Sequence, residues 1–71
     1  MDNETKQYIK GLMVGASTQD LINRVQDRMR AREFHLVRYK RIGDQTTKRA
    51  IDEIDSVIGL YETEIARRNN G

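Results

Sequence analysis

The chain has 71 residues, with 13 Lys or Arg, 11 Asp or Glu and a formal net charge of +2. It contains no Cys, Pro or Trp, which excludes disulfides. A structural zinc site of the usual kind is excluded as well, because His35 alone could supply a nitrogen ligand. A single core at this length rarely supplies more than about 3–5 kcal/mol, so we expect a homo-oligomer, most simply a homodimer.

No segment has the composition of a membrane span. The longest run of large apolar residues is Leu12-Met13-Val14, far short of the ~20 residues that a spanning helix needs. The N-terminal residues include Asp2 and Glu4 and lack the apolar region of a signal peptide. We therefore expect a cytoplasmic protein that does not contact a membrane.

The first predicted helix covers residues 3–14. Its large apolar residues share one helical face, and they are Tyr8, Ile9, Leu12 and Met13. A helix this short is marginal by itself. It must dock this face on another element.

The second predicted helix covers residues 18–42, and Ser17 is placed to cap its N-terminus. Its apolar residues fit a heptad seam, with Arg32 at the one vacant position: Ile22, Val25, Met29, Leu36 and Tyr39. At 1.5 Å per residue the helix spans roughly 37 Å.

Gly43 and Asp44 form the clearest break in the chain. Gly suits the left-handed position after a helix, and Asp can cap the next helix. The third predicted helix covers residues 45–68 and has an unbroken heptad seam, composed of Thr47, Ile51, Ile54, Ile58, Tyr61 and Ile65. A two-residue link between long helices predicts antiparallel neighbours.

These elements predict one all-α domain over residues 1–71. It consists of a short N-terminal helix and a long, coiled-coil-like antiparallel hairpin, which form a dimeric helical bundle. A turn at 43–44 predicts that facing residues have numbers adding to about 87. Facing pairs would then include Leu36 with Ile51, Met29 with Ile58, Ile22 with Ile65, and Arg32 with Asp55, with Arg24 or Arg28 in reach of Glu62.

Phe34 and Val37 lie on the side of the second helix away from its seam. Two arrangements could cover these two side chains. The first helix could fold back over them in a monomeric three-helix bundle, or a second copy could cover them in a four-helix bundle. The candidates for protein contact are therefore Tyr8, Ile9, Leu12, Met13, Phe34 and Val37.

Charge is divided unevenly between the long helices. Residues 18–42 carry seven basic and three acidic residues, a net charge of +4, whereas residues 43–71 carry a net charge of −2. Mutual neutralisation of the two helices is one reading of this division. The other is a phosphate-binding stripe about 21 Å long, formed by Arg24, Arg28, His35 and Arg38. The candidate residues for nucleic-acid contact are Arg24, Arg28, Arg38 and Arg41.

No constellation typical of an enzyme is present. His35 has neither a nucleophile nor a carboxylate at helical spacing, and the paired carboxylates Asp52/Asp55 and Glu62/Glu64 lie on helix surfaces. No glycine loop has phosphate-binding spacing. We expect no catalytic, metal or cofactor-binding residues, no cofactor and no small-molecule substrate.

The plan of residues 18–68 is similar to that of the Rop family, plasmid proteins in which dimeric helical hairpins bind paired RNA. The resemblance covers the plan and no sequence motif, and it implies a dimer of hairpins. From the residues themselves we expect a small, non-enzymatic interaction or regulatory protein that binds another macromolecule, with a protein partner favoured. Nucleic-acid binding is the alternative, and a structural or scaffold subunit is a third reading.

Overall fold

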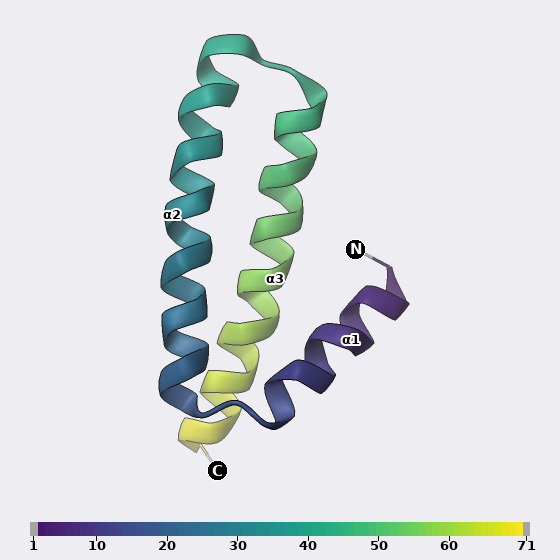
Figure 1. Ribbon diagram of the computed structural model, residues 1–71, viewed down its shortest axis with the longest axis vertical. Helices are drawn as coiled ribbons and strands as arrows, with labels where there is room; N and C mark the ends of the chain where they lie inside the picture. The colour runs from purple at the N-terminus through teal and green to yellow at the C-terminus, as the bar shows by residue number, and fades with distance from the viewer. Residues whose placement is uncertain (1, 71) are drawn as a thin grey trace.

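The computed structural model describes residues 2–70, which form three helices: α1 (Asn3–Val14), α2 (Thr18–Ile42) and α3 (Gln45–Asn70). The helices α2 and α3 lie antiparallel side by side, and α1 diverges from them at the end opposite their connecting turn (Figure 1). The predicted all-helical class and packed long helix pair are confirmed. The first two helices have the predicted bounds, and α3 ends two residues later than predicted.

Side chains of the preceding residues cap the first two helices. Asp2 Oδ1 accepts a hydrogen bond from the Thr5 N–H at 2.8 Å, and Ser17 Oγ accepts one from the Asp20 N–H at 3.0 Å. Each bond satisfies an N–H that has no partner within its own helix. The starts of α1 and α2 are therefore determined by local sequence.

The turn between the long helices has the predicted chemistry. Gly43 has a φ of 69°, and its N–H donates to the Tyr39 carbonyl at 2.7 Å. A left-handed residue with this bond ends a helix, and Gly takes the conformation without steric cost. Asp44 Oδ2 then accepts from the Thr47 N–H at 3.2 Å and caps α3.

The register of the hairpin agrees with the prediction. The Nε atom of Arg32 lies 2.6 Å from Oδ1 of Asp55, which is the expected ion pair. Met29 and Ile58 border the same surface depression as this pair. The heptad seam and the two-residue turn were therefore sufficient to align the two long helices.

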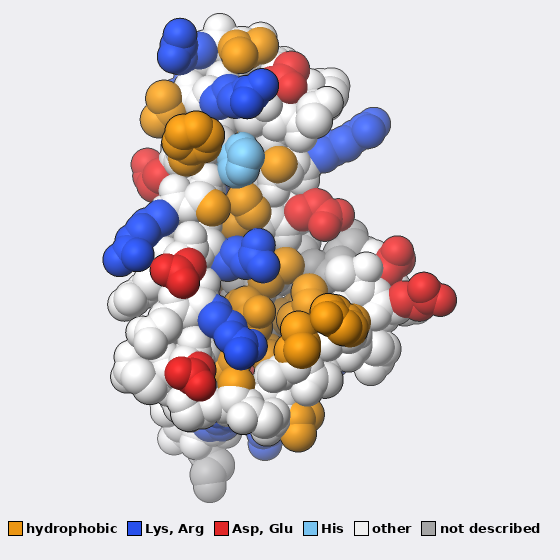
Figure 2. Space-filling view, viewed as in Figure 1, with side chains coloured by type: hydrophobic (Ala, Val, Ile, Leu, Met, Phe, Trp, Pro, Cys, Tyr) orange, Lys and Arg blue, Asp and Glu red, His pale blue; other side chains and the backbone are white. Residues whose placement is uncertain are grey.

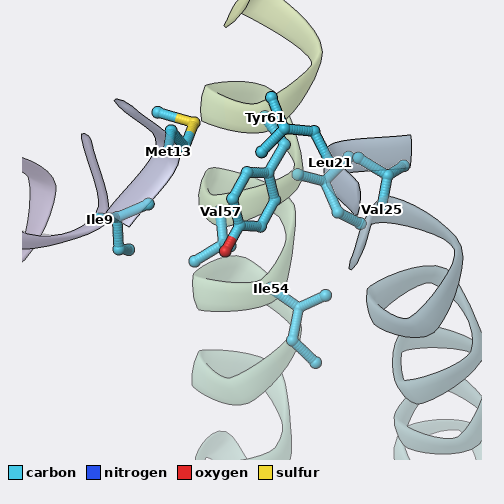
Figure 3. Close-up of a cluster of buried hydrophobic side chains, with 8 residues drawn as sticks. Ile9, Met13, Leu21, Val25, Ile54, Val57 and Tyr61 are labelled. Carbon is cyan, nitrogen blue, oxygen red and sulfur yellow. The ribbon is translucent and has the colours of Figure 1, made fainter. Parts of the chain in front are cut away.

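The core lies at the base of the hairpin, defined as the end where α2 begins and α3 finishes. Leu21 is completely buried, with an exposed fraction of 0%. The ring of Tyr61 on α3 lies between the α1 side chains and the α2 side chains (Figure 3). The cluster comprises Ile9, Met13, Leu21, Val25, Ile54, Val57, Ile58 and Tyr61.

The other end of the hairpin, next to the turn, has a thinner interior. Thr47 and Ile51 of α3 are buried there, but Leu36 and Tyr39 of α2 are only half-buried. A pair of helices can cover only one side of each member. The turn end therefore has a smaller buried core than the base.

The helix α1 packs against α3 at the base through Ile9 and Met13. The alternative in which it covers Phe34 and Val37 is wrong. Phe34 and Val37 stay exposed because α1 buries Ile9 and Met13 in the core against α3 instead.

Candidate interaction surfaces

Only part of the apolar face predicted for α1 is buried in the structure. Ile9 and Met13 are buried against α3, while Tyr8 and Leu12 remain exposed. The first pair therefore contributes to the core of the chain itself. The second pair remains available as a contact surface.

Phe34 and Val37 are open to solvent, with exposed fractions of 69% and 58%. With Ile42, which is 63% exposed, and two arginines they line a hollow of about 300 Å³. We call this surface the hairpin-end patch, and its residues are Phe34, Val37, Arg38, Arg41 and Ile42. The sequence identified its first two apolar members.

A second apolar surface, the rear groove, runs between α2 and α3. It has a volume of about 430 Å³ and is lined by Ile22, Val25, Gln26, Met29, Glu62, Ile65, Ala66 and Asn69. The sequence placed Ile22, Met29 and Ile65 in the buried seam, but Met29 is 46% exposed. When only two helices share a heptad seam, one edge of the seam stays open to solvent. The heptad pattern in the sequence therefore already indicated that a groove would lie here.

A front groove of about 440 Å³ lies on the opposite side of α2 and is lined by Leu12, Arg24, Asp27, Arg28, Ala31 and Tyr61. At 100° per residue, Arg24 and Arg28 point away from Ile22 and Met29 of the rear groove. Unlike the rear groove, the front groove includes a residue of α1, Leu12. It combines an apolar floor with two of the predicted basic residues.

The predicted basic stripe follows α2. Arg24 is half-buried in the front groove, and Arg28, Arg38 and Arg41 are exposed. Figure 2 shows Lys and Arg side chains along this helix, with apolar side chains over α1 beside them and over the turn end. Arg24 and Arg28 thus lie at one part of the helix, whereas Arg38 and Arg41 belong to the hairpin-end patch.

Ion pairing between the long helices is sparse. Within residues 2–70, Arg32–Asp55 is the one ion pair that joins α2 to α3. The predicted contact of Arg24 or Arg28 with Glu62 is absent there. The acidic residues of α3 pair mainly within α3, because residues three or four apart on one helix are nearer than those across the seam. Direct ion pairs between the long helices therefore involve few of their charged residues.

Arg68 makes a tertiary contact that sequence reasoning missed. Its guanidinium donates to the carbonyls of Met13 and Ala16, at 3.0 and 2.8 Å, and to Thr18 Oγ1 at 3.3 Å. The end of α3 is thereby joined to the link between α1 and α2. No local sequence pattern marks these partners, which lie 50 or more residues away along the chain.

Glu64 holds this arginine in place. Its carboxylate accepts from Arg67 at 2.6 and 2.8 Å and from Arg68 at 2.9 Å. Hydrogen bonds from Arg67 first, and then from Arg68, lower the pKa of Glu64 to about 2. The carboxylate is therefore ionised at neutral pH and orients both guanidinium groups.

His35 is half-buried on α2, and its ring meets that of Phe34 edge-on at 5.9 Å between centroids. Residues 2–70 contain no group of three or more His, Cys, Asp or Glu side chains arranged to hold a metal ion. In the same part of the chain, no helix is both long and apolar enough to cross a bilayer.

Comparison of the chain with protein-family models, with curated proteins and with solved structures found no match.

Proposed function

We propose that the chain is a small, non-enzymatic helical protein that acts by binding another macromolecule, and that it does so as a homodimer. The observation that carries this proposal is the apolar surface left open after the three helices have packed. Its large exposed members are Tyr8, Leu12, Val14, Met29, Phe34, Val37 and Ile42. Groups of exposed apolar side chains on a small protein are typical of contact sites.

The rear groove is the surface best suited to a second copy. It is apolar along its length, and Glu62 is its only charged lining residue. A two-fold contact places the same surface of each copy together. Few like charges would then meet, and two hairpins would form a four-helix bundle whose core includes Met29 from both copies.

Mass measurement over a range of concentrations tests the dimer. We expect a dimer by light scattering, and we expect Met29→Glu to shift it towards monomer because the new carboxylates would lie in the interface. Val14→Glu, a matched change at an exposed site outside the groove, should leave the mass unchanged. A monomer at all concentrations would contradict the dimer, and large open assemblies would favour the scaffold reading.

Nucleic-acid binding through the basic stripe is the second candidate function. One observation favours it: Arg24, Arg28, Arg38 and Arg41 have no ion-pair partner among residues 2–70. Each guanidinium is therefore available to replace counterions along a phosphate backbone.

A salt titration of binding to duplex RNA and DNA tests this candidate. Each phosphate contact adds roughly 0.9 to the slope of log affinity against log salt. We therefore expect the double variant Arg24→Ala/Arg28→Ala to lower the slope by up to about 2. Arg30→Ala/Arg49→Ala removes the same charge outside the stripe and should change the slope less, and absence of binding at low salt would exclude the candidate.

A further inference from the structure

The hairpin-end patch brings three exposed, large apolar side chains together on one helix. Phe34 and Val37 lie one turn apart on the outer side of α2, and Ile42 is the last residue of the helix. With the aliphatic stems of Arg38 and Arg41 they enclose the hollow of about 300 Å³. This depression can accept a large apolar side chain from another molecule.

No other part of residues 2–70 covers the patch. The helix α1 lies at the base of the hairpin (Figure 1), and α3 packs against the side of α2 that carries Leu21 and Val25. Phe34 and Val37 point away from that side. The occupant of the patch must therefore come from outside the described chain.

The rim of the patch is positively charged. Arg38 and Arg41 line the hollow, and neither has an ion-pair partner among residues 2–70. The nearby carboxylate of Asp44 caps α3 through Oδ2, and hydrogen bonds from Thr47, with a smaller contribution from the positive charge of Arg38, lower the pKa of that carboxyl. The patch therefore presents unpaired guanidinium groups around an apolar centre.

A second copy is a poor occupant of this patch. A two-fold contact would bring Arg38 and Arg41 of one copy against the same residues of the other. Juxtaposed like charges oppose such a contact. The rear groove, with one charged lining residue, does not impose this cost on a dimer.

A nucleic acid or a membrane surface also fits less well than a protein. Phe34 offers a stacking face and Arg38 and Arg41 offer donors, but Val37 and Ile42 offer a nucleic acid neither. Helices that lie in a membrane interface carry a broad apolar strip. Here the outer face of α2 continues from Phe34 through polar residues, which are Asn23, Asp27 and Arg30.

We propose that the hairpin-end patch docks an acidic amphipathic helix of a partner protein. An apolar side chain of that helix enters the hollow between Phe34, Val37 and Ile42. Carboxylates beside it pair with Arg38 and Arg41, which is the charge complementarity that the rim requires. This inference rests on the proposed function as an interaction protein and adds the chemistry of the partner.

Two synthetic helical peptides test the proposal. Both carry the same ridge of Leu residues, flanked by Glu in one peptide and by Lys in the other. Binding is measured by fluorescence anisotropy, and its position by amide shifts of the 15N-labelled protein. We expect the Glu peptide to bind at least roughly tenfold more tightly than the Lys peptide, with the largest shifts at residues 34–42.

Substitutions at exposed positions then test the residues themselves. Phe34→Ala, and separately Arg38→Ala/Arg41→Ala, should each weaken binding of the Glu peptide by roughly tenfold or more. Val14→Ala is the matched apolar control, and Lys6→Ala/Lys10→Ala, which removes two exposed positive charges from α1, is the matched charge control. Both controls should bind the Glu peptide as the unchanged protein does, and circular dichroism verifies that helix content is unaltered.

Each of the following results would overturn the proposal. The Glu peptide could cause amide shifts in α1 or in the rear groove instead. The chain would then still bind a protein, but through another surface. Equal binding of the Glu and Lys peptides would remove the charge requirement. Amide shifts at residues 34–42 on dilution of the protein alone would assign the patch to a second copy. Amide shifts that depend on Phe34 and appear with duplex RNA or phosphatidylserine vesicles, in place of the peptide, would assign the patch to those partners.

Failure of this proposal is distinguishable from failure of the proposed function. A dimer by mass measurement together with no binding of the Glu peptide overturns the patch alone. A monomer that binds neither peptides, RNA nor vesicles contradicts both.

Discussion

The two ends of the hairpin differ in how many helices meet there. At the base, α1 joins α2 and α3, and side chains from all three helices surround Tyr61 (Figure 3). At the turn end only α2 and α3 are present, and Phe34 and Val37 stay exposed. The third helix closes a core at the base, and the turn end has no comparable buried cluster. Exposed apolar side chains occur at both ends: Tyr8, Leu12 and Val14 on α1, and Phe34, Val37 and Ile42 near the turn.

The ends also differ in how their charged groups are used. At the base, Glu64 orients Arg67 and Arg68, and Arg68 reaches the backbone of the α1–α2 link. At the turn end, Arg38 and Arg41 have no ion-pair partner among the described residues. The charged groups at the end of α3 therefore stabilise the packing of the base, whereas Arg38 and Arg41 near the turn, like Arg24 and Arg28 further along α2, remain unpaired.

The largest expected effect is the loss of core packing at the base. Leu21→Ala should lower the free energy of unfolding by about 2–5 kcal/mol, because the side chain is completely buried and leaves a cavity. Leu36→Ala, the same change at the half-buried turn end, should cost roughly half as much. Urea unfolding of both variants measures the contrast, and equal losses would mean that the two ends are equally well packed.

The next effect concerns the contact that joins α3 to the α1–α2 link. Arg68→Ala should lower the free energy of unfolding by roughly 1–3 kcal/mol, because two carbonyls lose a charged donor. Hydrogen exchange should also become faster throughout α1. Arg67→Ala is the matched control, since Arg67 contacts Glu64 but not the link, and equal exchange in the two variants would argue against the role of Arg68.

Low pH should lower the stability of the hairpin at the end where α2 begins and α3 finishes, because Glu64 becomes protonated there. Its pKa is about 2 in the folded chain against an ordinary value of 4.5, so its stabilising contribution is present above pH 4.5 and is lost as the pH falls towards 2. Glu64→Gln should therefore be less stable than the unchanged protein at pH 7, by less than Arg68→Ala, and the difference should shrink over that interval. Urea unfolding at a series of pH values measures it, and a difference independent of pH would contradict the assignment.

The smallest effect is expected at the one ion pair between the long helices. A double-mutant cycle on Arg32→Ala and Asp55→Ala should give a coupling of about 0.2–1 kcal/mol, because both side chains are partly exposed. High salt should reduce this coupling. A coupling of several kcal/mol would mean that this pair, rather than the apolar seam, holds the register.

Local signals explain why most of the fold was predictable. Ser17, Gly43 and Asp44 set helix ends through bonds that span three or four residues, and such bonds depend on neighbouring sequence alone. The heptad seam and the two-residue turn together fixed the alignment of Arg32 with Asp55. The outward position of Phe34 followed from helical spacing in the same way.

Longer-range features were not predictable from the same patterns. The face of α1 was identified from its spacing, but which of its residues become buried depended on where α3 stands. Arg68 bonds to the carbonyls of Met13 and Ala16, and backbone carbonyls carry no sequence signature. The ion-pair pattern was also misjudged, because net charge per helix does not say which side chains come within reach.

The sequence by itself determined the helices, the turn and the register, because capping bonds and heptad spacing act within a few residues of one helix or across one seam. Only the tertiary structure decided that α1 closes the base and leaves the turn end open. The physical reason is that α1 is held by contacts between residues far apart in the chain: Ile9 and Met13 are buried against α3, and Arg68 bonds to the carbonyls of the α1–α2 link, which no local spacing specifies.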